Sequence, residues 1–341
     1  MDLESYIKEV NISLSKMDNG NYVEAHKSLK IILNSKSFLE LKKKDQFFIK
    51  KRYSRLLLAL GYFEEGWHYF KYNWIKNSFK FKEIFEQNNT IKYLIDLDQI
   101  QKNEKLLIWN DGGYGDFIYQ LRLIKNLQSR IKLKIYDNEL GHLLKDKKLL
   151  VSSSETFDWH LPVVEIPRVL KYNTIDYQNF NYNYLIDPTR KYEKYDNYIG
   201  LSYKTETSKS KSIDIKFLKR LFVERKDLNF LIIQKYLEKK DINFFSDFKN
   251  VTVIEDLDKN KIFEDTFNIL NSVNSVISID SVISHIAGYL GKRNYLLLSY
   301  QGHFYWGYNK KKCNDYPNHI IVKQKDKGDW DTVINEVIKL V

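Results

Sequence analysis

Two patterns of apolar positions divide the chain. Over residues 1–90, apolar residues recur every three or four positions, as in YVEAHKSLKIIL and YSRLLLALGYFEEGWHYF, which is the spacing of one helix face. Further along, short and nearly continuous apolar runs alternate with segments of helical spacing. Such alternation is typical of a parallel sheet covered by helices on both faces. We therefore expect an α/β protein preceded by a helical region.

The first α/β segment is short. KLLIWN (105–110) predicts a strand that ends at a glycine-rich turn, and DFIYQLRLIKNL after the turn returns to helical spacing. IKLKIYD (131–137) predicts a second strand. The segment 151–190 is less regular and holds three of the chain's 4 prolines. No element is predicted there.

From residue 197 the alternation is regular. The pattern predicts strands in YIGLSY, NFLIIQ, VTVIED, SVISID, NYLLLS and HIIVKQ, and helices over 214–225, 262–273, 281–291 and 330–340. We therefore predict a helical region at 1–95 and two Rossmann-like domains at 96–195 and 196–341. A ligand is expected in the cleft between the two domains.

The helical region shows weak internal similarity. GNYVEAHKSLKIIL from Gly20 and GYFEEGWHYFKYNW from Gly61 share a glycine, an aromatic residue and then a small residue, Ala25 or Gly66. The small residue would let paired helices approach closely. This resembles tetratricopeptide repeats, although the spacing exceeds their usual ~34 residues. An unrelated helical bundle is the alternative.

Composition narrows the function classes. The net charge of +11 suits phosphate binding or an anionic membrane surface, but the lysines are scattered among 44 acidic residues, as on a solvated basic surface. The single cysteine, Cys313, excludes a disulfide within the chain. No run approaches the ~20 apolar residues of a membrane span, and the first ten residues do not resemble a signal peptide. A cytoplasmic protein is expected.

The stretch NDGGYGDFIYQ carries the first candidate site. Gly112, Gly113 and Gly115 follow a strand and precede a helix, where free N–H groups suit a phosphate. The spacing is neither the dinucleotide fingerprint nor a Walker motif. Asp116 is then either a helix-capping acid or a general base that faces the cleft.

The stretch ISIDSVISHIAGYLGK carries the second candidate site. Asp280 ends a predicted strand, Ser281 can cap the following helix, and His285 lies one turn further along that helix. These side chains can converge beyond the sheet, whereas a buried core histidine is the alternative for His285. The lysines of SYKTETSKSKSID, among them Lys204 and Lys211, either bind a diphosphate or belong to a solvated loop.

Two Asp-x-Asp pairs are candidate metal sites. Both read DLD, one at Asp96 and Asp98 and the other at Asp256 and Asp258. In metal-dependent sugar transferases such a pair binds a divalent cation. The first pair precedes the first predicted strand and the second lies in a polar connection, so no metal site is predicted.

Together these segments resemble bacterial tetratricopeptide-linked glycosyltransferases, which are relatives of the lipopolysaccharide heptosyltransferases. LLIWNDGGYGDFIYQLRLI resembles the segment that opens their catalytic part, and FDWHLPVVEIPRVL their middle segment. FEDTFNILNSVNSVISIDSVISHIAGYLGKRNYLLLSY resembles their Asp-Thr/Ser-x-x-x-His signature followed by Ala-Gly-x-Leu-Gly-Lys. QKDKGDWDTVINEVIKL resembles their C-terminal end, and LLLALGYFEEGWHYFKYNW the repeat in front.

The resemblance implies a GT-B architecture of two Rossmann-like domains, with acceptor on the first and nucleotide-sugar on the second. It implies no metal and no cofactor besides the nucleotide-sugar substrate. Asp116 matches the catalytic base, Lys211 a basic residue after a flexible loop, and Gln234 the end of the strand beside the nucleotide. The predicted nucleotide-sugar contacts are Gly112, Gly113, Tyr114, Gly115, Lys204, Lys211, Gln234, Asp280, Ser281, Val282 and His285.

One segment departs from the family. Its usual Asp-Trp-Arg-Trp is here QGHFYWGYN, which keeps Trp306 but not the arginine. This departure puts the donor identity, and activity itself, in question.

The predicted function is therefore an inverting, metal-independent glycosyltransferase that transfers a sugar to a surface-glycan precursor, a lipid-linked glycan or a protein. A protein partner at the helical region and peripheral contact with the inner membrane are further candidates. The alternative is a catalytically inactive GT-B-like protein that binds a nucleotide or a partner. A nucleic-acid binder is disfavoured because the lysines are scattered.

Overall fold

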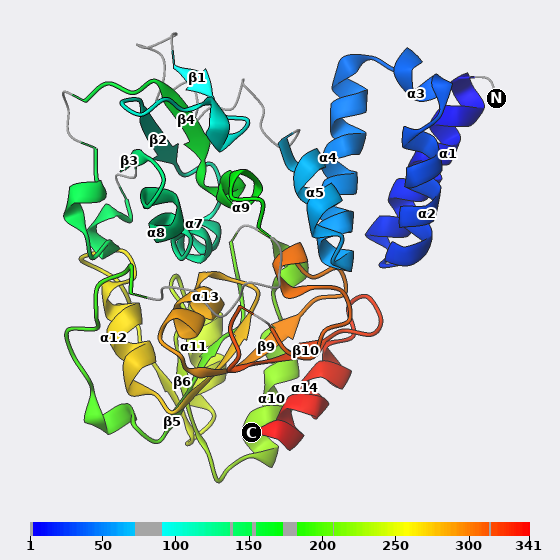
Figure 1. Cartoon of the computed structure of the whole chain (residues 1–341). Helices are drawn as coiled ribbons and strands as arrows, with labels where there is room; N and C mark the ends of the chain where they lie inside the picture. Colours follow the sequence, from blue (N-terminus) through cyan, green and yellow to red (C-terminus); the bar gives the residue numbers. More distant parts are fainter. Residues whose placement is uncertain are drawn as a thin grey trace. The chain divides into compact units, whose positions relative to one another are not determined.

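The computed structural model describes residues 3–71, 91–136, 139–151, 155–172, 183–206, 208–313 and 315–341. The chain forms two compact units, which are described separately below (Figure 1). Unit 1 comprises Met1–Asn138, Asp146–Asn181 and His303–Tyr308. Unit 2 comprises Glu139–Lys145, Tyr182–Gly302 and Asn309–Val341. The domain limits predicted at 95 and 195 stay a prediction.

The N-terminal part of unit 1 is helical, as its apolar spacing predicts. Its helices are α1 (Leu3–Asp18), α2 (Tyr22–Leu33), α3 (Lys36–Glu40), α4 (Lys43–Leu60) and α5 (Phe63–Phe70). α1 packs on α2, and α4 packs on α5. Gly61, at φ +89°, ends α4 in the left-handed conformation that favours glycine.

Close helix approach has a direct cause at Gly66. A Cβ at that position would lie 2.8 Å from two atoms of the Leu58 side chain, so α4 and α5 touch where the sequence places a small residue. The two helical hairpins are compatible with the predicted repeats, but the repeat family stays a prediction. The helical pattern predicted for 72–90 lies outside the described residues.

The sheet of unit 1 is parallel, with strand order β1-β4-β2-β3. Its strands are β1 (Lys92–Tyr93), β2 (Lys105–Trp109), β3 (Lys132–Tyr136) and β4 (Trp159–Pro162). The apolar β2 lies between β3 and β4, and its last four residues are buried. The structure confirms the predicted β2 and β3. It adds β1 and β4, and β4 belongs to the proline-containing segment in which no strand was predicted.

Short helices accompany this sheet. They are η2 (Leu97–Gln99), α7 (Tyr114–Leu121), α8 (Ile124–Gln128), η4 (Lys147–Leu149), η5 (Val163–Glu165) and α9 (Ile166–Val169). The predicted continuous helix 116–127 is therefore divided into α7 and α8. Unit 1 also includes η9 (Phe304–Trp306), which lies between two strands of unit 2 in sequence and packs on α4.

The sheet of unit 2 is also parallel, with strand order β10-β9-β8-β5-β6-β7. Its strands are β5 (Tyr198–Ser202), β6 (Asn229–Ile232), β7 (Val251–Val253), β8 (Ser275–Ile279), β9 (Arg293–Leu298) and β10 (His319–Lys323). All six strands predicted from their apolar runs are confirmed. β8 is buried throughout and lies between β5 and β9.

The helices of unit 2 cover this sheet. They are η3 (Gly141–Leu143), η7 (Glu193–Tyr195), η8 (Lys209–Lys211), α10 (Ile215–Glu224), α11 (Lys239–Ser246), α12 (Glu264–Ser272), α13 (Val282–Tyr289) and α14 (Trp330–Leu340). α10 and α14 lie side by side, and their apolar residues share one core with the strands (Figure 1). α13 packs on β8 and β9 and ends before Gly291, which has φ +67°.

Gly288, inside α13, tests how tightly unit 2 is packed. A Cβ there would lie 2.3 Å from Cδ1 of Tyr316, whose ring is fully buried. Helix propensity alone predicts that Gly288→Ala stabilises by about 1 kcal/mol. We expect instead a loss of about 1–3 kcal/mol, because overpacking displaces the ring. Urea denaturation decides between the two signs, and the loss should shrink in a Tyr316→Ala background.

Candidate functional site

The glycine-rich turn of unit 1 is held by two short side chains. The backbone N–H of Gly112 donates to Asn110 Oδ1 at 3.1 Å, and that of Gly113 donates to Asp116 Oδ2 at 2.9 Å. α7 begins at Tyr114, so Asp116 lies in its first turn and caps it. The capping role weighed for Asp116 is thus present, and a role as a base stays a prediction.

Gly112 is required by the carboxylate it faces. A Cβ at Gly112 would lie 2.9 Å from both Cβ and Oδ2 of Asp116. At Gly113 the nearest atom would be Asp116 Oδ2 at 3.5 Å, which is ordinary contact. The described contacts therefore explain one of the glycines by packing within the turn, with no ligand needed.

Asp111 is a second carboxylate in this turn, which the sequence analysis missed. Its Oδ1 is buried and has no hydrogen-bond partner in the described part of the chain. Burial, together with the charge of Glu165 and more weakly that of Asp116, raises the pKa of Asp111 to about 7. A carboxyl with a pKa near neutrality can exchange a proton at physiological pH. Its position directly after a strand and before a glycine pair was the signal available in the sequence.

Glu165, whose charge acts on Asp111, belongs to a buried ion pair. Glu165 Oε2 accepts from Arg168 Nε at 2.7 Å, and the side chains are 1% and 6% exposed. The Tyr93 hydroxyl also donates to Glu165, and Arg168 Nη2 donates to the Leu94 carbonyl at 2.8 Å. Burial raises the pKa of Glu165, while Arg168 opposes that rise. The pair ties α9 to β1 and places negative charge close to Asp111.

Cations of the helical region also act on this turn. The charges of Lys51 and Arg55, both on α4, interact with Asp111, and that of Arg55 also interacts with Asp116. The helical region therefore contributes to the electrostatics of the glycine-rich turn, as sequence analysis had not foreseen.

Asp111 gives unit 1 a stability that depends on pH. Its pKa is raised above the ordinary 3.8 to about 7, so the fold favours its protonated form, and stability present at low pH is lost as pH rises through that range. The free energy of unfolding of Asp111→Asn should exceed that of wild type by about 1–3 kcal/mol at pH 8.5, and by much less at pH 4.5. Urea denaturation at both pH values measures this, with the exposed Asp331→Asn as the control. Equal differences at both pH values would contradict the shift.

In unit 2, the second candidate site forms where β8 ends. Asp280 follows β8, is 9% exposed, and pairs through Oδ2 with Lys211 Nζ at 2.6 Å. Lys211 comes from η8, in the lysine-rich loop. The structure thus brings together Lys211 and Asp280, which are far apart in the sequence. Their ion pair lies next to the start of α13.

Ser281 precedes α13 at the N-cap position, but its side chain makes no cap hydrogen bond. The expectation that its hydroxyl caps the helix is therefore wrong. Its Oγ is buried and has no hydrogen-bond partner among the described residues. A buried, unsatisfied hydroxyl costs about 1–3 kcal/mol, so a polar ligand atom would stabilise it. Val282 is the first residue of α13, next to this hydroxyl.

His285 lies one turn further along α13 and is 4% exposed. Its Nδ1 lies 3.3 Å from the Tyr316 hydroxyl. Asp280, which the sequence places one turn before His285, forms its ion pair with Lys211. His285 therefore fits the alternative of a buried core histidine, and a role in donor binding stays a prediction.

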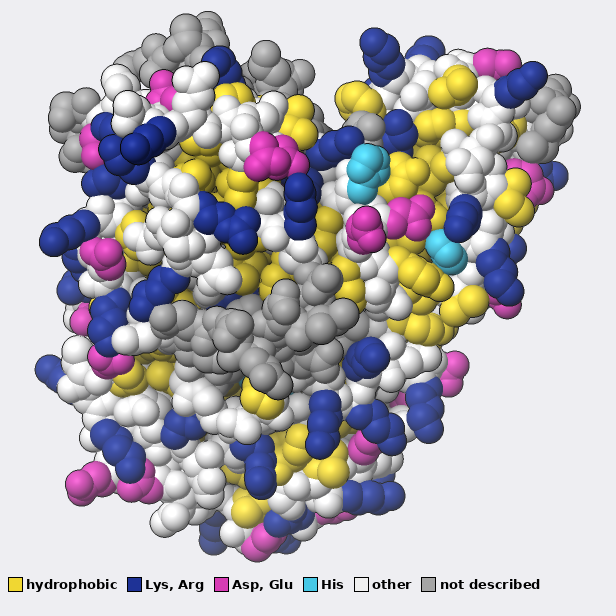
Figure 2. All heavy atoms as spheres, in the orientation of Figure 1, with side chains coloured by type: hydrophobic (Ala, Val, Ile, Leu, Met, Phe, Trp, Pro, Cys, Tyr) yellow, Lys and Arg dark blue, Asp and Glu magenta, His cyan; other side chains and the backbone are white. Residues whose placement is uncertain are grey.

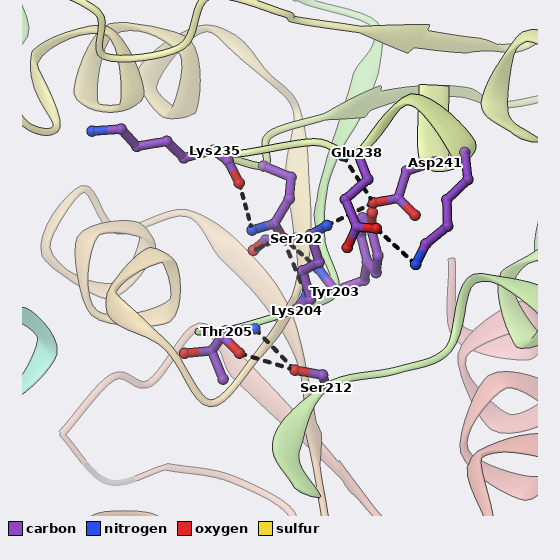
Figure 3. A network of polar contacts seen from close by, with 10 residues as sticks. Ser202, Tyr203, Lys204, Thr205, Ser212, Lys235, Glu238 and Asp241 are labelled. Atoms are coloured by element: carbon purple, nitrogen blue, oxygen red, sulfur yellow. Dashed lines mark hydrogen bonds and ion pairs between the residues drawn. The ribbon is translucent and has the colours of Figure 1, made fainter. Parts of the chain in front are cut away.

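Lys204 belongs to a polar network after β5 (Figure 3), and Gln234 joins it through hydrogen bonds to the backbone. Gln234 Oε1 accepts from the backbone N–H groups of Tyr203 at 3.3 Å and Lys204 at 3.1 Å, so it fixes the chain where β5 ends. Lys204 Nζ binds Asp241 Oδ2 at 2.6 Å. Burial would raise the pKa of Asp241, but hydrogen bonds from Lys204 and Tyr203 outweigh it and lower that pKa. Asp241, which sequence analysis missed, holds the lysine in place.

The structure is similar to solved structures of glycosyltransferases. "E. coli heptosyltransferase WaaC with ADP-2-deoxy-2-fluoro heptose" is 12% identical over 69% of this chain and 99% of its own, with a TM-score of 0.45. The iron-containing dodecameric glycosyltransferase TibC from enterotoxigenic E. coli is 11% identical over 68% of this chain and 66% of its own, with a TM-score of 0.48. The family 9 glycosyl transferase from Veillonella parvula is 10% identical over 72% of this chain and 96% of its own, with a TM-score of 0.47. No protein-family model and no curated protein matches the chain.

The Asp-x-Asp pairs have structural roles. Asp96 Oδ1 accepts from the Asp98 N–H at 3.3 Å and caps η2. Asp258 accepts from the N–H and the hydroxyl of Thr266, at 3.0 and 2.6 Å. Within the described residues, no group of three or more His, Cys, Asp or Glu side chains could hold a metal ion.

Surface charge and hydropathy add little to the site. On the face shown in Figure 2, lysines and arginines are spread out and interleaved with acidic side chains, as on a solvated basic surface. Among the helices of the described residues, none combines the length and the apolar character needed to cross a membrane.

Proposed function

We propose that this chain is a GT-B-type, inverting glycosyltransferase that uses a nucleotide-sugar and needs no metal. Unit 2 would bind the donor and unit 1 the acceptor, which is a surface-glycan precursor, a lipid-linked glycan or a protein. The observation that carries the proposal is the corner at the end of β8. There, the Lys211–Asp280 pair and the unsatisfied Ser281 hydroxyl lie at the start of α13, and Asp280 and Ser281 belong to the segment that resembles the glycosyltransferase signature.

The chemistry follows from these groups. An acceptor hydroxyl oxygen forms a bond to the anomeric carbon while the bond from that carbon to the diphosphate oxygen breaks. The hydroxyl proton passes to the Asp116 carboxylate as the new bond forms, since a free alcohol is far too weak an acid to be deprotonated beforehand. Negative charge grows on the departing diphosphate. Lys211, Lys204 and the free N–H groups of α13 would stabilise that charge.

Donor binding must rearrange the lysines. Lys204 and Lys211 are each paired with a carboxylate, Asp241 and Asp280, at 2.6 Å. A diphosphate would compete with these carboxylates for the ammonium groups. The same pairing, together with QGHFYWGYN in place of the family's arginine-containing motif, favours the second candidate function, a nucleotide-binding protein without transferase activity.

A thermal-shift screen against ADP, GDP, UDP, CDP and their sugars tests donor binding. A ligand at 100-fold its dissociation constant stabilises by about 2.7 kcal/mol, which is readily measured. Lys211→Met should raise the dissociation constant of the best ligand by about 10- to 100-fold, because one charge-assisted hydrogen bond to phosphate is lost. Lys216→Met, whose side chain is 70% exposed and whose ion pair with Asp214 spans 3.7 Å, is the matched control.

The outcomes separate the candidates. Binding of a nucleotide-sugar followed by release of the nucleoside diphosphate supports the transferase. Binding without turnover of any donor, with glycan, lipid-linked and protein acceptors supplied, supports the non-catalytic protein. No binding of any member of the panel contradicts both.

A further inference from the structure

The segment His303–Tyr308 belongs to unit 1, although the residues on both sides of it belong to unit 2. This segment contacts the N-terminal helices through a backbone hydrogen bond and aromatic rings. The Tyr308 N–H donates to the Ala59 carbonyl at 2.8 Å, and the Tyr308 ring lies 4.9 Å from the Tyr22 ring. The Phe304 ring packs against those of Trp67 and Phe70. This is the segment, within QGHFYWGYN, that departs from the glycosyltransferase motif.

Tyr305 extends from this segment onto α7. Its ring centroid lies 4.3 Å from that of Tyr119, and Gln120 Nε2 donates to its hydroxyl oxygen at 3.3 Å. Gln120 lies four residues after Asp116, one turn along the same helix face. The Tyr305 hydroxyl also forms a hydrogen bond with the Asp116 carboxylate.

The direction of these hydrogen bonds is determined by their donors. A tyrosine hydroxyl has one proton, and the Gln120 amide already donates to its oxygen. A carboxylate can only accept. The Tyr305 hydroxyl therefore donates its hydrogen bond to Asp116. The same carboxylate also accepts from the Gly113 N–H at 2.9 Å.

We propose that Tyr305 is a positioning residue for Asp116, holding its carboxylate in the orientation in which it takes the acceptor proton. This rests on the proposed function. Two donors, one from the turn and one from the His303–Tyr308 segment, restrict the rotation of the carboxylate. Positioning of a reacting group within a few tenths of an ångström has large effects on rate.

The ionisation of Tyr305 is compatible with this role. Burial, followed by the charge of Asp116, raises the pKa of Tyr305 well above its ordinary value. The hydroxyl therefore keeps its proton, and remains a donor, throughout the pH range in which an enzyme works.

Tyr305→Phe tests the role once a donor from the panel is turned over. Phenylalanine keeps the ring against Tyr119 and removes only the hydroxyl. We expect kcat to fall about 10-fold with an unchanged KM for the donor, since one hydrogen bond to a charged group is lost. Tyr308→Phe, in the same segment, should match wild type.

A double variant separates positioning from a structural role. In an Asp116→Asn background, Tyr305→Phe should cause no further loss of kcat, because Tyr305 acts through Asp116. A loss of equal size in both backgrounds overturns the proposal, and so does a Tyr305→Phe enzyme with wild-type kcat. If Tyr305→Phe does not fold, Gln120→Leu, which removes the donor to the Tyr305 oxygen, should lower kcat at an unchanged KM for the donor, and a wild-type kcat overturns the proposal.

The test also separates this proposal from the proposed function. A wild type that turns over no donor overturns the proposed function, and the role of Tyr305 with it. An active wild type that Tyr305→Phe matches overturns only the role of Tyr305.

Discussion

Asp116→Asn should lower glycosyl transfer by about 10²- to 10⁴-fold while leaving donor affinity within about twofold of wild type. Asparagine has nearly the same shape and keeps an oxygen that can accept from the Gly113 N–H, as Asp116 Oδ2 does at 2.9 Å. The cap of α7 is then retained, and only the ability to take up a proton is lost. Initial rates of nucleoside diphosphate release, together with donor titrations, measure the two effects.

The control for this substitution is a capping aspartate elsewhere. Asp329 Oδ1 accepts from the Thr332 N–H at 3.0 Å at the start of α14, and it has no role in the proposed reaction. Asp329→Asn should keep wild-type turnover. If Asp116→Asn also kept turnover, Asp116 would be a capping residue alone, and Asp111, the neighbouring carboxyl with a pKa of about 7, would be the next base to test.

Arg168→Met should destabilise the protein by about 3–5 kcal/mol. The substitution removes the cation that binds Glu165 Oε2 at 2.7 Å and leaves a carboxylate that is 1% exposed without its partner. It also removes the hydrogen bond from Arg168 Nη2 to the Leu94 carbonyl. The midpoint of urea denaturation at pH 7 measures the loss, provided that the transition is two-state.

Two comparisons show whether burial is the cause. Arg220→Met breaks an exposed i,i+4 pair with Glu224 and should cost no more than about 0.5 kcal/mol. Arg168→Met combined with Glu165→Gln should recover much of the lost stability, because the uncompensated buried charge is removed with the arginine. A single variant as stable as Arg220→Met would show that the Glu165 carboxyl is already neutral in the fold.

Most of the sheet of unit 2 could be predicted from sequence, because β5, β6, β8 and β9 are largely buried and read as nearly continuous apolar runs. The same reasoning missed β4. Its four residues, Trp159–Pro162, include a polar histidine and end in a proline, so they show neither a strand period nor a continuous apolar run. β4 is nevertheless paired with β1 and β2, which only the folded sheet could show.

The candidate site divides in the same way. The sequence identified the glycine-rich turn and the Asp280–Ser281 corner, since each follows an apolar run directly. The sequence could not show which hydrogen bonds or ion pairs these side chains make. Ser281 takes the cap position but makes no cap bond, and Lys204 is held by Asp241.

By itself, the sequence determined the helical region, the alternation of strands and helices, and the places where polar residues follow strands, because these depend on spacing over a few neighbouring positions. Only the tertiary structure decided that burial, and after it the charge of Glu165, raises the pKa of Asp111, and that Tyr305 reaches Asp116. Charge interactions and long-range hydrogen bonds depend on which distant segments the crossover connections bring together. No local period in the sequence records that information.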